Sequence, residues 1–104
     1  MSIKRLLIAN RGEIAVRIVR AAEAMGIETI QVYSEADADM LACKQADVTV
    51  CVGGAAAKDS YLNIPNILAA AKETDADAVH PGYGFLAESA KFAQAVVGAG
   101  MIWV

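Results

Sequence analysis

The stretch from His80 to Ser89 concentrates the side chains of this sequence that could form a ligand site. It reads His-Pro-Gly-Tyr-Gly-Phe-Leu-Ala-Glu-Ser. The proline fixes one backbone angle, whereas Gly82 and Gly84 allow conformations or close approaches that a side chain would forbid. Tyr83 and Phe85 place two aromatic rings beside these glycines. Such a stiff aromatic loop suits a flat, partly apolar ligand; the alternative is a tight turn whose rings only cap the core.

The residues on either side of this loop indicate where it lies in the fold. A short apolar run at residues 76–79 precedes it, and a segment with helical periodicity, residues 88–97, follows it. The loop is therefore predicted to leave the carboxyl end of a strand and to enter a helix. In open α/β sheets, ligands bind in the crevice outside the carboxyl ends of the strands. This position is compatible with a ligand site, and the alternative of a turn whose rings cap the core stays open.

Two other loops have the composition of phosphate-binding turns, but neither carries the full motif. The turn Asn10-Arg11-Gly12 follows an apolar run, yet it holds one glycine where a dinucleotide fingerprint needs three. Arg11 and nearby helix amides could hold an anion, or Arg11 could tether neighbouring loops. Lys58 follows Ala57 and precedes Asp59, so the small-residue loop at residues 53–57 is not a P-loop. A nicotinamide, flavin or P-loop site is not predicted.

Metal and nucleophile chemistry have little support in the sequence. The carboxylates of Glu35, Asp37 and Asp39 could bind Mg²⁺, although helix capping and solvation also explain them. Cys43 and Cys51 are eight residues apart, without metal-ligand spacing, and are interpreted as structural thiols. With a single histidine, neither a zinc site nor a Ser-His-Asp triad is expected. No metal ligand and no catalytic residue is therefore assigned.

The composition indicates one small, soluble domain. A length of 104 residues suffices for one core. A net charge of -3 argues against general nucleic-acid binding, although residues 1–20 carry five basic side chains against one acidic side chain. That basic end marks either a partner surface or an ordinary solvated face. No apolar run approaches the ~18 residues of a membrane span, and no signal-peptide cleavage site is present, so a cytoplasmic location is expected.

The predicted elements alternate between strand and helix. Strands are expected at residues 6–9, 29–33, 48–52, 76–79 and 101–104, with helices at 13–25, 40–45, from 65 onward and at 88–97. The first helix is predicted to bury the stripe Ile14, Ala15, Ile18, Ala22 and Met25. Ser60 is interpreted as a helix cap. Alternation of this kind implies an α/β fold, a Rossmann-like three-layer structure with a parallel sheet of about five strands.

Three segments, in this order, resemble one known family. They are Ile8-Ala9-Asn10-Arg11-Gly12-Glu13-Ile14-Ala15, then Ser60-Tyr61-Leu62-Asn63-Ile64, and then His80-Pro81-Gly82-Tyr83-Gly84-Phe85-Leu86 with Glu88. Together they closely resemble the N-terminal domain of biotin carboxylases, the ATP-dependent parts of acetyl-CoA, propionyl-CoA and methylcrotonyl-CoA carboxylases. Pyruvate carboxylase is similar but matches residues 60–64 less well. The resemblance covers essentially all 104 residues and implies a Rossmann-like domain that precedes an ATP-grasp region.

The resemblance also implies an activity for the longer protein. Members use Mg²⁺ and ATP to activate bicarbonate and then carboxylate biotin on a carrier protein or domain, which serves a carboxyltransferase component. The ligands of ATP and Mg²⁺ belong to ATP-grasp and C-terminal domains expected beyond residue 104, so residues 1–104 alone are expected to be inactive. In the family, the loop matched by Tyr83 and Gly84 lies against biotin, and Gly82 and Phe85 would shape it.

Further roles follow from the same resemblance. His80 and Arg11 are expected to brace loops rather than to catalyse. Arg20 matches a basic position of the homodimer interface that members often form, although Ala24 stands where a partner acid is often found. The sequence also departs from the family at Ala42-Cys43 and Gly53-Gly54. These departures suggest a divergent member and leave the acyl-CoA substrate undetermined.

Three functions remain in view at this point. The first is part of a biotin carboxylase, contributing one wall of the biotin site. The second is a non-catalytic module that keeps the fold for dimerisation or for docking a biotinylated carrier. The third, a free-standing nucleotide-binding regulator, is opposed by the two incomplete phosphate motifs.

Overall fold

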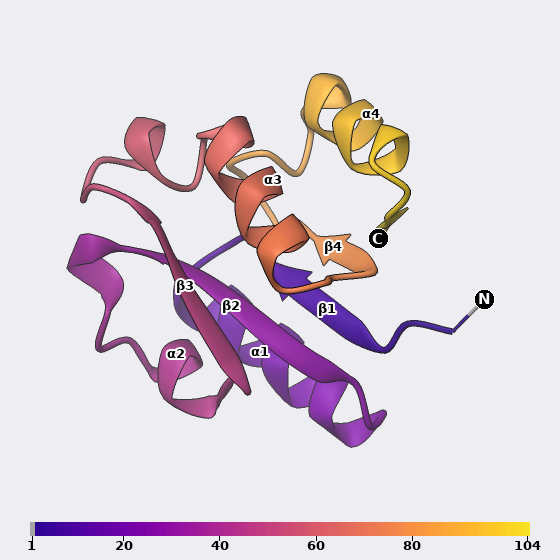
Figure 1. Cartoon of the computed structure of the whole chain (residues 1–104). Helices are drawn as coiled ribbons and strands as arrows, with labels where there is room; N and C mark the ends of the chain where they lie inside the picture. Colours follow the sequence, from indigo (N-terminus) through magenta and orange to yellow (C-terminus); the bar gives the residue numbers. More distant parts are fainter. Residues whose placement is uncertain (1) are drawn as a thin grey trace.

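A five-stranded parallel sheet forms the centre of the protein (Figure 1). The computed structural model describes residues 2–104. The strands, in chain order, are β1 Arg5–Ile8, β2 Glu28–Ser34, β3 Val48–Gly53, β4 Ala78–His80 and β5 Ile102–Trp103. Their order across the sheet is β3-β2-β1-β4-β5, and every neighbouring pair is parallel. The predicted α/β class, strand number and strand direction are confirmed.

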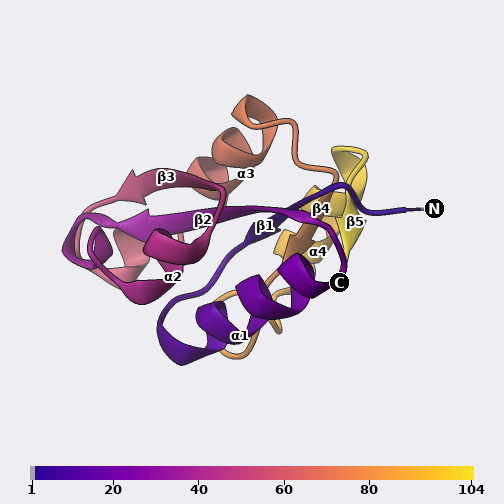
Figure 2. The same cartoon turned by 90° about the horizontal axis from the view of Figure 1, so that it is seen from below.

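Helices cover both faces of this sheet, which gives three layers (Figure 2). The helices are α1 Gly12–Ala24, α2 Leu41–Gln45, α3 Ile64–Glu73 and α4 Ala90–Gly98, with single 3-10 turns at η1 Glu35–Asp37 and η2 Ala57–Asp59. Buried side chains of α1 and α2 pack in one cluster, and those of α3 and α4 pack in another. The three-layer arrangement predicted from the alternation of elements is therefore present.

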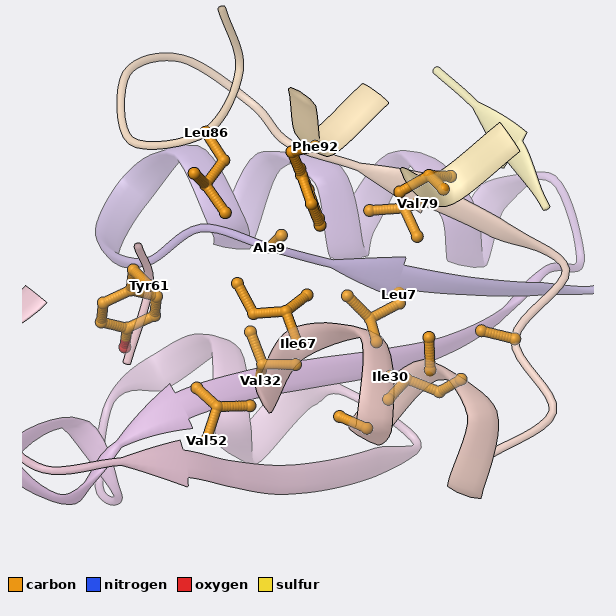
Figure 3. Close-up of a cluster of buried hydrophobic side chains, with 14 residues drawn as sticks. Leu7, Ala9, Ile30, Val32, Val52, Tyr61, Ile67, Val79, Leu86 and Phe92 are labelled. Atoms are coloured by element: carbon orange, nitrogen blue, oxygen red, sulfur yellow. The ribbon is translucent and has the colours of Figure 1, made fainter. Parts of the chain in front are cut away.

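Strand β1 lies in the middle of the sheet and contributes to both hydrophobic clusters. Leu7 is fully buried among the α3 and α4 side chains (Figure 3), whereas Leu6 and Ile8 pack with α1 and α2. This alternation follows from the two-residue side-chain period of a strand. Leu7 lies level with Ile30 of β2 and Val79 of β4. A continuous apolar run therefore fits a strand that is covered on both faces.

The buried face of α1 differs from the predicted stripe. Val16 and Val19 are buried together with Ala15 and Ala22, whereas Met25 is 74% exposed. The helix ends at Ala24, because a left-handed turn at Gly26 (φ 73°) carries the chain away towards β2. Met25 therefore lies past the helix end, outside the packed face.

The cap of α3 also differs from the prediction. Asn63 is the N-cap, and its side-chain oxygen accepts the Asn66 backbone N–H at 3.0 Å. Ser60 instead donates its hydroxyl to the Ala56 carbonyl oxygen at 3.0 Å and lies within the turn that precedes the helix. Pro65 occupies the first turn of α3, as predicted. In α4, Ser89 caps the helix, and Val97 is 61% exposed.

The chain reverses direction across the sheet between β1 and β4. After β1 the chain enters α1 on one face, and after β4 it enters α4 on the opposite face (Figure 2). The carboxyl ends of these two neighbouring strands therefore border a topological switch point, the usual ligand crevice of open α/β sheets. Within residues 2–104, none of the helices has the length and apolar character that crossing a bilayer requires.

Candidate functional site

Two loops meet at the carboxyl ends of β1 and β4. The first is the turn from Ala9 to Arg11, which leads into α1. The second is the segment from His80 to Phe85, here called the aromatic loop. A backbone hydrogen bond of 3.0 Å from the Ala9 N–H to the His80 carbonyl oxygen closes the sheet between them. The predicted strand-to-helix position of the aromatic loop is thus confirmed, since β4 ends at His80 and α4 begins at Ala90.

A buried amide joins the two loops. Asn10 is only 1% exposed, and its side-chain Nδ2 donates to the carbonyl oxygens of Pro81 at 2.8 Å and Tyr83 at 2.6 Å. Its Oδ1 accepts the Arg11 backbone N–H at 2.8 Å. Every hydrogen-bonding atom of this amide is therefore used. The aromatic loop is fixed at two carbonyl groups by one side chain from the β1–α1 turn.

Glycine is required at position 82 for two independent reasons. Its φ of 66° lies in the left-handed region, which side chains rarely adopt. A Cβ placed there would stand 2.8 Å from Asn10 Nδ2 and 2.8 Å from Ile14 Cγ2. The Gly82 N–H donates to His80 Nδ1 at 3.1 Å. The absence of a side chain thus lets the loop lie directly against Asn10 and α1.

Tyr83 and Gly84 form the exposed tip of the loop. The Tyr83 side chain is 80% exposed, and the space that a Cβ of Gly84 would occupy has no heavy atom within 4 Å. Gly84 also has a positive φ of 69°. The tip therefore offers a free ring face beside a backbone position that is open to solvent.

A mostly apolar groove with a volume of about 570 Å³ runs from Tyr83 along α1. Protein pockets for small ligands commonly have volumes of ≈ 300–1,000 Å³. Aliphatic side chains of α1 and its flanking segments line the groove, and the loop side is formed by His80, Gly82 and Tyr83. The charged lining side chains are Glu13 and Arg17, which pair at 3.2 Å.

Phe85 points to a different part of the protein from Tyr83. Its ring stacks on Tyr61, with centroids 5.2 Å apart and an interplanar angle of 28°. Tyr61 belongs to the cluster on the α3 and α4 face (Figure 3), and Leu86 is buried in the same cluster. Phe85 adopts a positive φ of 46°, which is costly for a residue with a side chain. The two rings of the aromatic loop therefore do not form one surface.

The ring under Phe85 is held by an ionic hydrogen-bond network. The Tyr61 hydroxyl donates to Asp37 Oδ2 at 2.6 Å, and the Arg11 guanidinium contacts both oxygens of Asp37 at 2.7 Å. The Ser34 backbone N–H donates to the Tyr61 hydroxyl oxygen at 3.2 Å, and the Ser34 hydroxyl donates to Asp37 Oδ2 at 3.3 Å. These contacts join the segments after β1, β2 and β3.

The contacts in this network shift the pKa values of Asp37 and Tyr61 away from their ordinary values. The Arg11 guanidinium hydrogen bonds lower the pKa of Asp37 to about 2, against the opposing effect of burial. Burial and the neighbouring carboxylate raise the pKa of Tyr61 to about 12. The network therefore contains an ionised carboxylate and a neutral phenol across the physiological range.

His80 lies at the base of the aromatic loop. Its Nδ1 accepts the Gly82 N–H, so the Nδ1 lone pair must be free of a proton. Burial lowers the pKa of this imidazole, which favours the neutral form that the hydrogen bond needs. The His80 side chain thus supports the backbone of the aromatic loop.

The remaining residues singled out in the sequence have other surroundings than those considered there. Among residues 2–104, the acidic residues, histidine and cysteines do not gather into a group of three that could hold a metal ion. Asp37 is instead engaged by Arg11 and Tyr61. Cys43 is half-buried, but Cys51 is exposed on the edge strand β3, so its interpretation as a packed thiol was wrong. Arg20 lies exposed on α1 and does not line the groove.

Asn10, Asp37 and Tyr61 are the site residues that the sequence analysis did not select for these roles. A polar residue directly after a buried apolar strand was the available signal for Asn10, because a buried amide must find hydrogen-bond partners. Nothing in the local sequence connects Asp37 with Tyr61, which is 24 positions away.

Comparisons with known proteins identify the family of this chain. A family model described as "Biotin carboxylase, N-terminal domain" matches residues 2–104. Biotin carboxylase 1 of Bacillus subtilis is 64% identical over 92 residues, which cover 88% of this chain and 20% of that protein. The mitochondrial propionyl-CoA carboxylase alpha chain of Caenorhabditis briggsae is 52% identical over 96 residues, covering 92% of this chain and 13% of that one.

Solved structures show the same fold at high identity. A biotin carboxylase from Campylobacter jejuni, in a complex described as beta-gamma-ATP, superposes with a TM-score of 0.95 at 50% identity, covering 98% of this chain and 23% of that one. The Kluyveromyces lactis urea amidolyase gives a TM-score of 0.96 at 42% identity, covering 97% and 6% of the two chains. The chain spans about a fifth of the length of the biotin carboxylases it matches.

Proposed function

Because the chain belongs to the family of biotin carboxylase N-terminal domains, we propose that it forms one wall of the biotin site in an ATP- and bicarbonate-dependent carboxylase. The observation that carries this proposal is the aromatic loop at the β1/β4 switch point. Its tip presents an 80% exposed Tyr83 ring beside an apolar groove of about 570 Å³. An exposed ring on a stiff backbone is suited to cover the bicyclic ring system of biotin.

The loop residues have separate roles in this proposal. The Tyr83 ring covers the ligand, and Gly84 leaves space for the polar ligand edge to reach the backbone. Gly82 lets the loop lie close to α1. Phe85 acts indirectly, because its stack on Tyr61 fixes the far end of the loop. His80 and Arg11 brace the loop and its surroundings through their hydrogen bonds to Gly82 and Asp37.

The proposed reaction needs groups that this chain does not contribute. Bicarbonate is activated with ATP and Mg²⁺ before the ureido nitrogen of biotin is carboxylated. The β1–α1 turn is filled by Asn10 and Arg11 rather than by a glycine-rich phosphate loop, and the described residues do not gather a carboxylate cluster. The chain therefore does not fit a phosphate or metal site, and we assign those steps to the rest of the longer protein.

The proposed function also implies partner proteins for the longer protein. The biotin would arrive on a carrier protein or domain, and a carboxyltransferase component would use the product. The exposed face of α1 carries Arg20, which we assign to a homodimer contact in the longer protein. Substitution Arg20→Glu should then shift the full-length protein from dimer to monomer in sedimentation velocity; an unchanged dimer would remove Arg20 from the interface.

The central test is the substitution Tyr83→Ala in the full-length carboxylase. Loss of a stacking surface worth about 1–1.5 kcal/mol should raise the KM for free biotin about 5- to 15-fold. Tyr83→Phe keeps the ring and should retain most of the affinity. Val97→Ala, at an exposed position on α4, is a matched control that should leave KM unchanged. An unaltered biotin KM in Tyr83→Ala would remove Tyr83 from the site.

A second measurement tests whether the groups that use ATP and Mg²⁺ lie outside residues 1–104. Residues 1–104 alone should show no bicarbonate-dependent ATP hydrolysis, since the residues that fit ATP and Mg²⁺ are assigned elsewhere. Turnover above background by the purified 104-residue chain would contradict that assignment.

A further inference from the structure

We propose that Asn10 is the positioning residue of the aromatic loop, and that the presentation of Tyr83 to ligand depends on its side-chain amide. This inference rests on the proposed function, because it concerns the same biotin site. Asn10 does not reach the exposed face of the Tyr83 ring. It acts on the backbone that carries that ring.

Tyr83 is held in place by the loop backbone rather than by packing of its ring. Its side chain is 80% exposed, so packing contributes little to the direction of the ring. The position of Tyr83 and the direction of its Cα–Cβ bond are therefore set by the backbone of the aromatic loop. Asn10 Nδ2 donates to the carbonyl oxygens of Pro81 at 2.8 Å and Tyr83 at 2.6 Å, which are the bonds that reach this backbone from another part of the chain. Two further bonds lie within the segment itself, from the Gly82 N–H to His80 Nδ1 at 3.1 Å and from the Ala87 N–H to the Gly84 carbonyl oxygen at 2.9 Å. The one amide group of Asn10 thus forms hydrogen bonds to the loop backbone on both sides of Gly82.

Only a side-chain amide fulfils this role at position 10. The two loop carbonyls need donors, whereas the Arg11 backbone N–H needs an acceptor, and asparagine offers both from one planar group. A carboxylate of the same shape would place an oxygen against two carbonyl oxygens. An alanine would leave the carbonyls without their partner and open a gap beneath Gly82.

Asn10 is itself fixed from the neighbouring strand. The side chain of Gln31 is fully buried, and its Nε2 donates to the Asn10 carbonyl oxygen at 2.7 Å. The same nitrogen donates to the Val32 carbonyl oxygen at 2.7 Å. A second buried amide therefore ties the backbone of Asn10 to β2. The Asn10 side chain therefore extends to the loop from a backbone position that a hydrogen bond to Gln31 holds in place.

Gly82 lets the backbone of the aromatic loop pack directly against the side-chain amide of Asn10. A Cβ at this position would stand 3.2 Å from Asn10 Cγ as well as 2.8 Å from Asn10 Nδ2. The loop backbone is therefore in direct packing contact with the amide plane. Hydrogen bonds on both sides of a tightly packed glycine leave the tip with little freedom, which is the preorganisation that ligand contacts benefit from.

The test compares Asn10→Asp with Asn66→Asp in the full-length carboxylase. Asn66 serves as a control, because its Nδ2 also donates to a backbone carbonyl, that of Val52 at 2.8 Å, and neither residue belongs to the aromatic loop. The first readout is amide hydrogen exchange of the peptide covering residues 80–87. The second is the KM for free biotin, with the KM for ATP as reference.

Asn10→Asp should increase exchange in residues 80–87 at least 10-fold and raise the biotin KM at least 5-fold, with the ATP KM unchanged. Asn66→Asp should change neither loop exchange nor the biotin KM. In a Tyr83→Ala background, Asn10→Asp should add little to the biotin KM, because Asn10 acts through Tyr83. If Asn10→Asp does not fold, Asn10→Ala makes the same test without adding a charge.

The possible results separate the two proposals. Unchanged exchange in residues 80–87 would overturn the positioning role of Asn10. Faster exchange with an unchanged biotin KM would support that role and overturn the placement of biotin at Tyr83. Equal, additive increases in the ATP and biotin KM values would indicate general unfolding and overturn the specific role.

Discussion

The substitution Asp37→Asn tests whether an ionised carboxylate holds the loops around the site together. In the native protein, both Asp37 oxygens contact the Arg11 guanidinium at 2.7 Å, and Oδ2 also accepts the Tyr61 hydroxyl at 2.6 Å. Asparagine keeps the size of the side chain and can still accept the phenol hydrogen bond. It cannot form the charged pair with Arg11. The substitution therefore isolates the ionic contribution.

The size of the effect follows from the pKa of Asp37. That pKa falls from 3.8 to about 2, and each unit corresponds to about 1.4 kcal/mol of preference for the charged form. This gives an upper value of about 2.5 kcal/mol. The Asp37 side chain is 11% exposed, but that of Arg11 is 49% exposed, so solvent screening reduces the expected contribution to about 1–2 kcal/mol.

The dependence on pH has a definite sign. A carboxyl group with a lowered folded-state pKa binds protons more readily when the chain is unfolded. Its contribution is therefore complete above about pH 5, and it is lost as the pH falls from there towards 2. At pH 7, Asp37→Asn should reduce the free energy of unfolding by about 1–2 kcal/mol, and the difference from the native protein should approach zero near pH 2.

Urea unfolding of the 104-residue chain can measure this difference at pH 7, 5, 4 and 3. The single tryptophan, Trp103, packs edge-on against Phe92 with centroids 5.4 Å apart, so its fluorescence should report unfolding of the core. Urea is preferred to guanidinium because a salt would screen the ion pair. Asp39→Asn, an exposed change in the same loop region, should have an effect below about 0.5 kcal/mol at each pH.

Two results would refute the reasoning about Asp37. A loss of stability that stays constant from pH 7 to pH 3 would show that packing, and not charge, explains the effect. No loss at pH 7 would show that the desolvation of the pair cancels its attraction, as happens for some buried ion pairs.

Three further substitutions test the core and the loop by urea unfolding. Tyr61→Phe should cost about 1–3 kcal/mol, because it deprives a carboxylate and a backbone N–H of their buried partner. Gly82→Ala should cost about 1–3 kcal/mol through its positive φ and its close contacts, whereas Gly98→Ala, in a helix with open space around it, should be neutral or stabilising. Phe92→Ala should cost about 3–5 kcal/mol, since Phe92 is fully buried, whereas Val97→Ala should change stability by less than about 0.5 kcal/mol. Equal effects in the glycine pair would contradict the backbone constraint at Gly82, and equal effects of Phe92→Ala and Val97→Ala would contradict their assigned burial.

The strands and the position of the aromatic loop could be predicted from sequence because their signals are local. A strand covered on both faces must be apolar throughout, and β1 shows this pattern. Glycines and a proline between an apolar run and a capped helix mark a strand-to-helix turn. The parallel arrangement then places the loop at the carboxyl edge of the sheet.

The buried face of α1 was harder to predict for a physical reason. The helix carries apolar residues around most of its circumference, so several stripes fit a period of 3.6 residues equally well. Ile14 and Ile18 are half-buried and line the groove, whereas Val16 and Val19 pack against the sheet. Only the tertiary arrangement decides which of these stripes faces the core.

The separation of Tyr83 from Phe85 also lies outside what a local pattern can show. The sequence shows two rings at alternate positions beside glycines, but it does not show in which direction each ring points. The positive φ of Phe85 turns its ring towards Tyr61 on the α3 and α4 face, while Tyr83 stays beside α1. A non-glycine residue in this conformation is maintained by its surroundings, here by the Tyr61 ring, which lies 24 positions earlier in the chain.

Two consecutive residues of the β1–α1 turn connect to the two ends of the aromatic loop. Asn10 bonds directly to the backbone that carries Tyr83, whereas Arg11 bonds to Asp37, which holds the Tyr61 ring under Phe85. A glycine-rich turn at this position would leave the loop without either support. The turn that binds phosphate in dinucleotide-binding folds therefore has a different task here, since its side chains fix a neighbouring loop. Loss of Asn10 should release mainly the Tyr83 end, and loss of Asp37 mainly the Phe85 end.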